Sequence, residues 1–175
     1  MADFFNLTAE KNENYIRITN ELDDIKDFCR DSEFQFFTRE ERTVELEGTT
    51  GNEWPDFMYE KEIPLVSKRF KEFLLEENGV DYFYYKKMIL KKSTGEEKEY
   101  WLALPPRIES FHTRRSEIDK EANRVIHFFM NPRKYGYFEI FKCADVVNEE
   151  IAVIDSLAEK IKAQDFKGVI LEPLK

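Results

Sequence analysis

The clearest structural signal in the chain is Pro64-Leu65-Val66-Ser67-Lys68-Arg69-Phe70-Lys71-Glu72-Phe73-Leu74, which is followed by Asn78-Gly79. Ser67 is a residue type whose hydroxyl oxygen caps helix N-termini. The two Phe residues and the last Leu of the stretch fall on one face of a helix that begins there. Gly79 readily adopts the left-handed conformation at which many helices end. The stretch therefore predicts a short amphipathic helix that ends near Gly79.

A β-hairpin is expected directly after this helix. Residues 81–90 are rich in aromatic and β-branched side chains, which favour strands. Ser93-Thr94-Gly95-Glu96 has the composition of a turn, and Tyr100-Trp101-Leu102-Ala103-Leu104 returns as the partner strand. Residues 107–123 are polar and indicate either a loop or an irregular helix. Two further strands are predicted at 124–130 and 137–143, with Asn131-Pro132 ending the first of them.

The C-terminal part reads as a helix followed by a strand. Asn148 is a suitable cap, and Glu149 and Glu150 are favourably placed in the first helical turn. An apolar stripe with helical spacing then runs through Ile151, Ile154, Leu157, Ala158 and Ile161. Val169-Ile170-Leu171 predicts the last strand. Together with strand 137–143, this makes a strand–helix–strand unit at the edge of a mixed sheet.

The first sixty residues are less regular. Strands are predicted at residues 4–7, 15–19, 34–36 and 44–46, and a helix at about 20–30. Residues 48–55 are dense in turn formers. We expect a single α+β domain over 1–175, with a mixed, mostly antiparallel sheet and a few flanking helices. If a minor N-terminal lobe (1–60) is distinct from a main region (61–175), the boundary lies at this loop.

Composition narrows the classes of partner. The chain has 175 residues, a net charge of −9 and a pI of about 5.0. Such a negative surface repels nucleic acid and anionic lipid, and it favours a basic protein partner. No apolar run reaches the roughly 20 residues that span a bilayer. The N-terminus does not resemble a signal peptide. Cys29 and Cys143 indicate buried thiols, with one disulfide as the alternative, and we expect a cytoplasmic protein.

Motifs for chemistry are absent from the sequence. It contains no P-loop, GxGxxG, GxSxG or HExxH. We therefore predict no catalytic residues, no cofactor and no metal. His112, in Ser110-Phe111-His112-Thr113-Arg114-Arg115, is the candidate acid–base residue if the chain is an enzyme, but a solvated polar loop is the alternative. His127 lies in a strand pattern and indicates a packed or cross-strand residue.

The order of these elements resembles a bacterial immunity-protein family of polymorphic toxin systems, which is named after a myxobacterial protein and was formerly a domain of unknown function. The similarity runs from about Pro64 to Leu174. It rests on the Ser67 helix, the hairpin and the strand Phe138–Phe141. At the C-terminal end it rests on Val146-Val147-Asn148-Glu149-Glu150 and Phe166-Lys167-Gly168-Val169-Ile170-Leu171-Glu172-Pro173. Residues 107–123 depart from the family pattern and are a candidate for divergent binding.

The resemblance implies a non-enzymatic protein that binds and neutralises a cognate bacterial toxin. Two alternatives remain open: a small hydrolase or transferase that uses acidic residues and His112, and a regulatory protein-interaction module. For the partner surface we predict Glu53, Trp54 and Asp56, in the loop from residue 48 to 56. An acidic surface there would attract a basic toxin domain, and Trp is enriched among residues that dominate interfaces. Folding of Trp54 back onto the core is the alternative.

Overall fold

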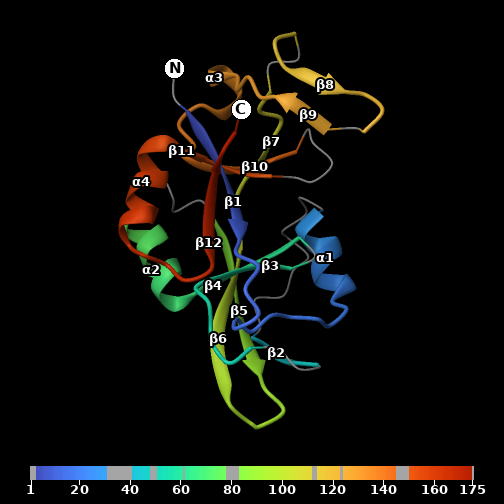
Figure 1. Cartoon of the computed structure of the whole chain (residues 1–175), viewed down its shortest axis with the longest axis vertical. Coiled ribbons are helices and arrows are strands. Elements are labelled where there is room, and N and C mark those ends of the chain that lie inside the picture. The colour runs from blue at the N-terminus through green and yellow to red at the C-terminus, as the bar shows by residue number, and fades with distance from the viewer. Residues whose placement is uncertain are drawn as a thin grey trace.

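A computed structural model describes residues 3–30, 41–47, 51–60, 62–77, 83–111, 114–122, 124–144 and 150–174 (Figure 1). They form two five-stranded sheets, a separate two-stranded ribbon and four short helices. Among the described strands, all neighbours run antiparallel except the pairs β2–β5 and β7–β10. This confirms the predicted α+β class with mostly antiparallel sheets.

The first sheet brings both ends of the chain together. Its strand β1 lies between β11 and β12 and is antiparallel to both. In spatial order the strands of this sheet are β12 (Val169–Pro173), β1 (Phe4–Ala9), β11 (Ile151–Ile154), β10 (Ile140–Cys143) and β7 (Arg107–Ile108).

The second sheet is built around the predicted hairpin. Strands β5 and β6 pair over their full lengths, from Tyr84 opposite Leu104 to Lys91 opposite Glu97. In spatial order the strands are β2 (Arg42–Glu45), β5 (Tyr84–Lys91), β6 (Glu97–Leu104), β4 (Ile63–Ser67) and β3 (Phe57–Glu60). The ribbon consists of β8 (Glu117–Asp119) and β9 (Arg124–His127) and projects from one end of the molecule (Figure 1).

Period-two alternation lets both sheets bury side chains on both faces. An inter-sheet core combines Leu7, Phe57 and Val66 with α2 (Lys68–Glu76) and α4 (Asp155–Ala163), which lie next to each other on one flank of the molecule (Figure 1). A second core lies between the other face of the second sheet and α1 (Asp23–Arg30). A third lies between the first sheet and the base of the ribbon, near α3 (Pro132–Tyr135).

The helix predicted from Ser67 is confirmed. The Ser67 hydroxyl accepts a hydrogen bond from the Phe70 N–H at 3.2 Å, and Phe70 and Leu74 are buried. The helix ends at Glu76, before Asn78-Gly79, which lies outside the described residues. The residues before Ser67 belong to strand β4, so the chain passes from strand to helix at this cap without a loop.

The start of the C-terminal helix differs from the prediction, because the residues before it fit two kinds of secondary structure. Ile151–Ile154 is a strand rather than the first turn of a helix, and α4 begins at Asp155. Apolar residues at 151, 154, 157 and 158 fit helical spacing, but Ile151–Ile154 is also a short β-branched run that can fill a central strand. Asn148 lies outside the described residues. The prediction for residues 148–154 was therefore wrong where the structure can test it.

Three further segments differ in whole or in part from the prediction. Residues 15–19 form no strand: Tyr15 makes one isolated bridge to Glu53, although Ile16 and Ile18 are buried as the alternation implied. Residues 107–123, predicted as a loop or an irregular helix, contain the two short strands β7 and β8, and their other described residues form no helix. The strand predicted at 137–143 begins only at Ile140, and it follows the short helix α3, which Asn131 caps through the Arg133 N–H at 3.1 Å. The strand predicted at 34–36 falls outside the described residues.

The close approach of the last turn to strand β3 gives a test of the packing. Gly168 has φ +81°, and a Cβ there would lie 2.9 Å from Pro55 Cβ and 3.1 Å from the Phe57 carbonyl oxygen. Gly95 has φ +93°, and among the described residues no atom beyond its chain neighbours would lie within 4 Å of a Cβ there. We expect Gly95→Ala to cost about 1–2 kcal/mol from backbone strain. Gly168→Ala should cost about 1–3 kcal/mol more because of the added contacts.

Urea unfolding of the two variants measures this difference. Both glycines have a positive φ, so the loss of stability from backbone strain is common to the two variants. The additional loss of unfolding free energy in Gly168→Ala therefore reports the contact with the 55–57 segment. Equal losses of unfolding free energy would contradict the packing of this turn against β3.

Candidate functional site

The loop before β3 is held against the N-terminal segment by backbone hydrogen bonds. Glu53 N–H donates to the Asn14 carbonyl at 2.9 Å, and Ile16 N–H donates to the Glu53 carbonyl at 2.8 Å. A Cβ at Gly51 would lie 2.1 Å from the Asn14 carbonyl, so glycine permits this close approach. Glu53, the first of the predicted partner residues, has an exposed side chain. The described part of the loop, 51–56, is thus held at Glu53 by the N-terminal segment and at Asp56 by the Lys167 carbonyl.

Trp54, the second predicted partner residue, folds back onto the second sheet. Its indole Nε1 donates to Glu96 Oε1 at 2.9 Å, and its ring lies 5.9 Å from that of Tyr100. The Lys92 ammonium lies 5.1 Å from the ring centroid. Trp54 packs against the core beside α1. The alternative weighed from the sequence, a Trp that packs on the core, describes this conformation.

Asp56, the third predicted partner residue, is buried and faces inward. Its Oδ1 accepts from the Ser67 hydroxyl at 2.6 Å, and its Oδ2 accepts from Arg69 Nη2 at 2.9 Å and from the Lys167 N–H at 2.8 Å. We call this arrangement, together with residues 164–166, the Asp56 junction. It joins the start of β3, the β4–α2 boundary and the turn before β12. Asp56 is therefore placed as a structural residue, and the three predicted residues do not form one exposed surface.

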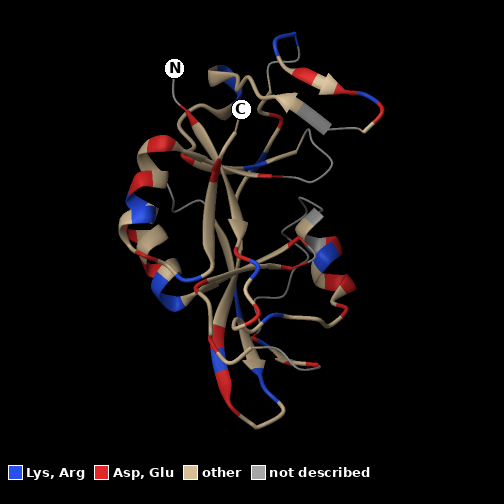
Figure 2. Cartoon of the chain, viewed as in Figure 1, with Lys and Arg blue, Asp and Glu red and all other residues tan. Residues whose placement is uncertain are grey.

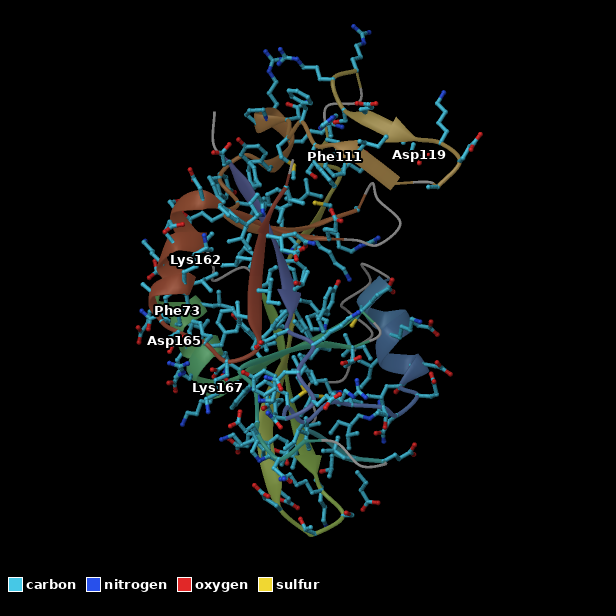
Figure 3. All side chains as sticks on the ribbon, viewed as in Figure 1. Phe73, Phe111, Asp119, Lys162, Asp165 and Lys167 are labelled. Carbon is cyan, nitrogen blue, oxygen red and sulfur yellow. The ribbon has the colours of Figure 1, made fainter. Side chains whose placement is uncertain are left out.

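Arg69 extends the junction toward the turn after α4. Its guanidinium donates to the Gln164 carbonyl at 3.1 Å and the Asp165 carbonyl at 3.2 Å, and it lies 4.5 Å from the Phe166 ring centroid. Figure 3 shows Asp165 and Lys167 beside α2, close to Phe73. One side chain thus binds carbonyl oxygens that would otherwise face water at the end of α4.

Electrostatics of the junction favour the charged form of Asp56. Burial by itself raises the pKa of this carboxyl, but the hydrogen bonds from Arg69, Ser67 and the Lys167 N–H outweigh burial, so the pKa is lowered. Tyr100 lies next to the junction and donates its hydroxyl proton to the Pro55 carbonyl at 2.6 Å. Burial and the Asp56 charge raise the pKa of Tyr100, which keeps its hydroxyl protonated.

Beside the junction lies a hollow with a volume of about 760 Å³. We call it the Tyr15 groove. One wall is the N-terminal segment 9–17, and the other is formed by the loop and strand β3. The lining residues are Ala9, Glu10, Lys11, Asn12, Glu13, Tyr15, Ile16, Arg17, Gly51, Pro55, Phe57, Met58 and Glu60.

Charged side chains stand on both walls of this groove. Glu10 and Glu13 on one wall and Glu60 on the other are exposed, and the exposed Glu53 adjoins them. Lys11 and Arg17 offset part of this negative charge. Burial, followed by the nearby negative charge and hydrogen bond of Glu10, raises the pKa of the Tyr15 hydroxyl. The groove therefore offers several carboxylates and a protonated phenol to a bound group.

The sequence did not reveal the N-terminal wall of this groove. Segment 9–17 was interpreted partly as a strand, and its charged residues carry no motif. Only the turn-rich composition of 48–55 pointed to the region. The junction was also missed, because Asp56 and its partner N–H at Lys167 are 111 residues apart in the chain.

The residues considered for catalysis do not meet in the described structure. His112 lies outside the described residues. His127 is exposed on β9 opposite Glu117, with 3.6 Å between Nε2 and Oε2, as expected for a cross-strand residue. Cys29 and Cys143 are buried thiols rather than a disulfide pair. In the part of the chain that the structure describes, no three His, Cys, Asp or Glu side chains gather in a way that could hold a metal ion.

Comparison with protein-family models finds no match to the chain, and comparison with curated proteins also finds none. The resemblance to the immunity-protein family thus rests on the residues given in the sequence analysis. Within the described ranges, every helix is too short or too polar to cross a membrane.

The lowered pKa of Asp56 predicts a specific pH dependence of stability. Because this pKa lies below its unfolded value, the junction stabilises the fold fully above about pH 4 and loses its contribution as pH falls further. We expect Asp56→Asn to cost about 2 kcal/mol at pH 7, since a buried charge-assisted hydrogen bond is worth roughly 1.5–3 kcal/mol. The difference from the parent chain should shrink between about pH 4 and pH 2.

Chemical unfolding of both chains across this pH range gives the measurement. Glu53→Gln changes an exposed carboxyl three residues away and serves as the control, with an expected effect within about 0.5 kcal/mol. A constant difference between the parent chain and Asp56→Asn from pH 7 to pH 2 would refute the charged junction.

Proposed function

We propose that this chain is an immunity-type protein of the bacterial cytoplasm, which binds a cognate toxin domain of basic character and neutralises it without catalysing a reaction. The resemblance of residues 64–174 to the polymorphic-toxin immunity family supports this proposal. The net charge of −9 also supports it, because complementary charge raises association rates.

The observation that carries the proposal is the Tyr15 groove. Exposed carboxylates stand on both walls, Glu10 and Glu13 on one and Glu60 on the other, and they can attract Lys or Arg side chains of the partner. Charge-assisted pairs of this kind fix the position of a basic side chain more strongly than neutral contacts do. The described residues that line the groove include no histidine or cysteine. Its composition favours binding over nucleophilic or metal chemistry.

Rigidity of the groove suits tight binding. The loop wall is bonded to segment 14–16 by the Glu53 backbone and is anchored below by the Asp56 junction. A preorganised surface loses little conformational entropy when a partner binds. A regulatory interaction module would use the same surface, and only the identity of the partner separates it from an immunity protein.

Co-expression tests the function directly. The candidate toxin is the product of a toxin-like gene that neighbours the gene for this chain. We expect cells that express its basic domain to stop growing and to recover when this chain is co-expressed. Recovery should depend on a stable complex that co-purifies. Failure to protect, despite normal folding of both proteins, would contradict the proposed function.

The role of the groove is tested by charge reversal. The triple variant Glu10→Lys, Glu13→Lys, Glu60→Lys should slow association with the toxin domain at least about tenfold at low salt, because steering charge is removed at the contact. Stopped-flow mixing at low and physiological salt measures the rate. Asp56 is left unchanged, because its substitution would disturb the fold.

A matched variant separates local from overall charge. Glu76→Lys, Glu159→Lys, Glu172→Lys changes the net charge equally at exposed positions on α2, α4 and β12. We expect it to slow association about threefold or less, since charges beyond the Debye length of about 8 Å at physiological salt are largely screened. Equal slowing by both variants would show that the groove is not the toxin contact.

A further inference from the structure

The segment that carries the ribbon, residues 105–138, has a net charge opposite in sign to that of the rest of the chain. Residues 105–138 contain seven basic and four acidic residues, which gives a net charge of +3. Because the whole chain has a net charge of −9, the remaining residues carry −12. Figure 2 shows Lys and Arg at the outer turns of the ribbon and in α3. At physiological salt the Debye length is about 8 Å, so an approaching molecule senses this local charge more than the total.

Exposed apolar side chains gather in the same part of the fold. Of the four large hydrophobic side chains most exposed in the described ranges, Ile118, Ile126 and Tyr137 belong to this end, and Tyr137 is 83% exposed. Ile118 lies on β8 opposite Val125, next to Ile126 on β9, where the strand register shifts. Irregularities of this kind re-aim side chains. Exposed apolar residues rimmed by polar ones mark interaction surfaces.

The ribbon is held in place by hydrogen bonds at its tip and by ring and backbone contacts at its base. Asp119 Oδ1 accepts from the Glu121 and Ala122 N–H groups at 3.0 Å each, which orders the tip. At the base, the Phe111 ring lies 5.0 Å from the Phe128 ring, and Asn131 N–H donates to the Ser110 carbonyl at 2.7 Å. Figure 3 shows Phe111 at this base and Asp119 at the far end.

A small hollow with a mixed polar and apolar lining adjoins the base of the ribbon. It has a volume of about 80 Å³ and is lined by Asp3, Phe4, Phe128, Phe129, Met130, Tyr135 and Leu174. Its size suits one small apolar side chain. In protein interfaces, apolar side chains that enter pockets supply most of the binding energy. The charges around them select the partner.

We infer that this ribbon end is a second docking surface, separate from the Tyr15 groove, and that it takes an acidic polypeptide segment that presents apolar side chains. Apolar contacts with Ile118, Ile126 and Tyr137 supply the affinity, and the local positive charge selects acidic partners. Nucleic acid fits less well, because it has no aliphatic side chains to cover the exposed Ile118 and Ile126. This inference does not depend on toxin binding by the groove.

The test uses a labelled random copolymer of glutamate and tyrosine as the probe, measured by fluorescence anisotropy against the full chain. Polyglutamate and a 20-nucleotide single-stranded RNA serve as comparison probes. We expect the copolymer to bind with a Kd below about 1 mM and at least about tenfold more tightly than either of the other two, a difference of about 1.4 kcal/mol.

Variants then locate the binding. Ile118→Ser with Ile126→Ser, and separately Arg114→Glu with Arg115→Glu, should each weaken copolymer binding at least tenfold. The matched controls are Leu75→Ser, which removes an exposed apolar residue of α2, and Lys68→Glu with Lys98→Glu, which makes the same charge change elsewhere. Both should leave the Kd within threefold. Circular dichroism checks that every variant is folded.

Each contrary outcome overturns the inference in a different way. No measurable copolymer binding would exclude an acidic polypeptide as the occupant. Equal binding of polyglutamate would mean that charge alone acts and that the isoleucines have no role. Tighter binding of RNA would assign the surface to nucleic acid. Equal loss in the control variants would place the contact elsewhere. Toxin neutralisation by the same variants is a separate readout and can succeed or fail independently.

Discussion

The Asp56 carboxylate receives hydrogen bonds from two parts of the chain that are far apart in sequence, and the arrangement of the two sheets depends on it. Ser67 and Arg69 contribute from the start of α2, and Lys167 N–H contributes from the turn that leads into the first sheet. A buried carboxylate is costly without such partners, because desolvation opposes its charge. Full satisfaction of its oxygens by these donors therefore specifies one relative placement of β3, α2 and the 164–168 turn.

The Tyr15 groove is a consequence of this placement. Its loop wall continues directly into Asp56, and the other wall is bonded to the loop through Glu53. Glu10, at the edge of that second wall, donates its N–H to the Gly168 carbonyl at 2.8 Å, so the turn next to the junction also positions the groove. The positions of the groove carboxylates are thus determined by buried polar contacts rather than by the surface residues themselves.

Local signals allowed much of the fold to be predicted. Ser67 with its apolar stripe marked α2, and the aromatic run with its Ser-Thr-Gly turn marked the β5–β6 hairpin. Ile151–Ile154 was misassigned because its spacing fits both a helix and a buried strand, and only pairing with β1 and β10 decides between them. Asp56 was taken as a surface acid because its partners lie 11, 13 and 111 residues away. Trp54 was grouped with it because Trp is enriched at interfaces and lies in the same loop, but its ring packs on the second sheet.

The central claim is that the groove formed by segments 9–17 and 51–60 is where the chain contacts a basic toxin domain. Hydrogen–deuterium exchange of the chain, alone and in complex with that domain, tests it most directly, because exchange reports protection segment by segment. The account predicts that the toxin domain increases protection in 9–17 and 51–60 and leaves the ribbon strands 117–127 unchanged. Protection confined to the ribbon, or absent from both groove walls in a stable complex, would contradict it.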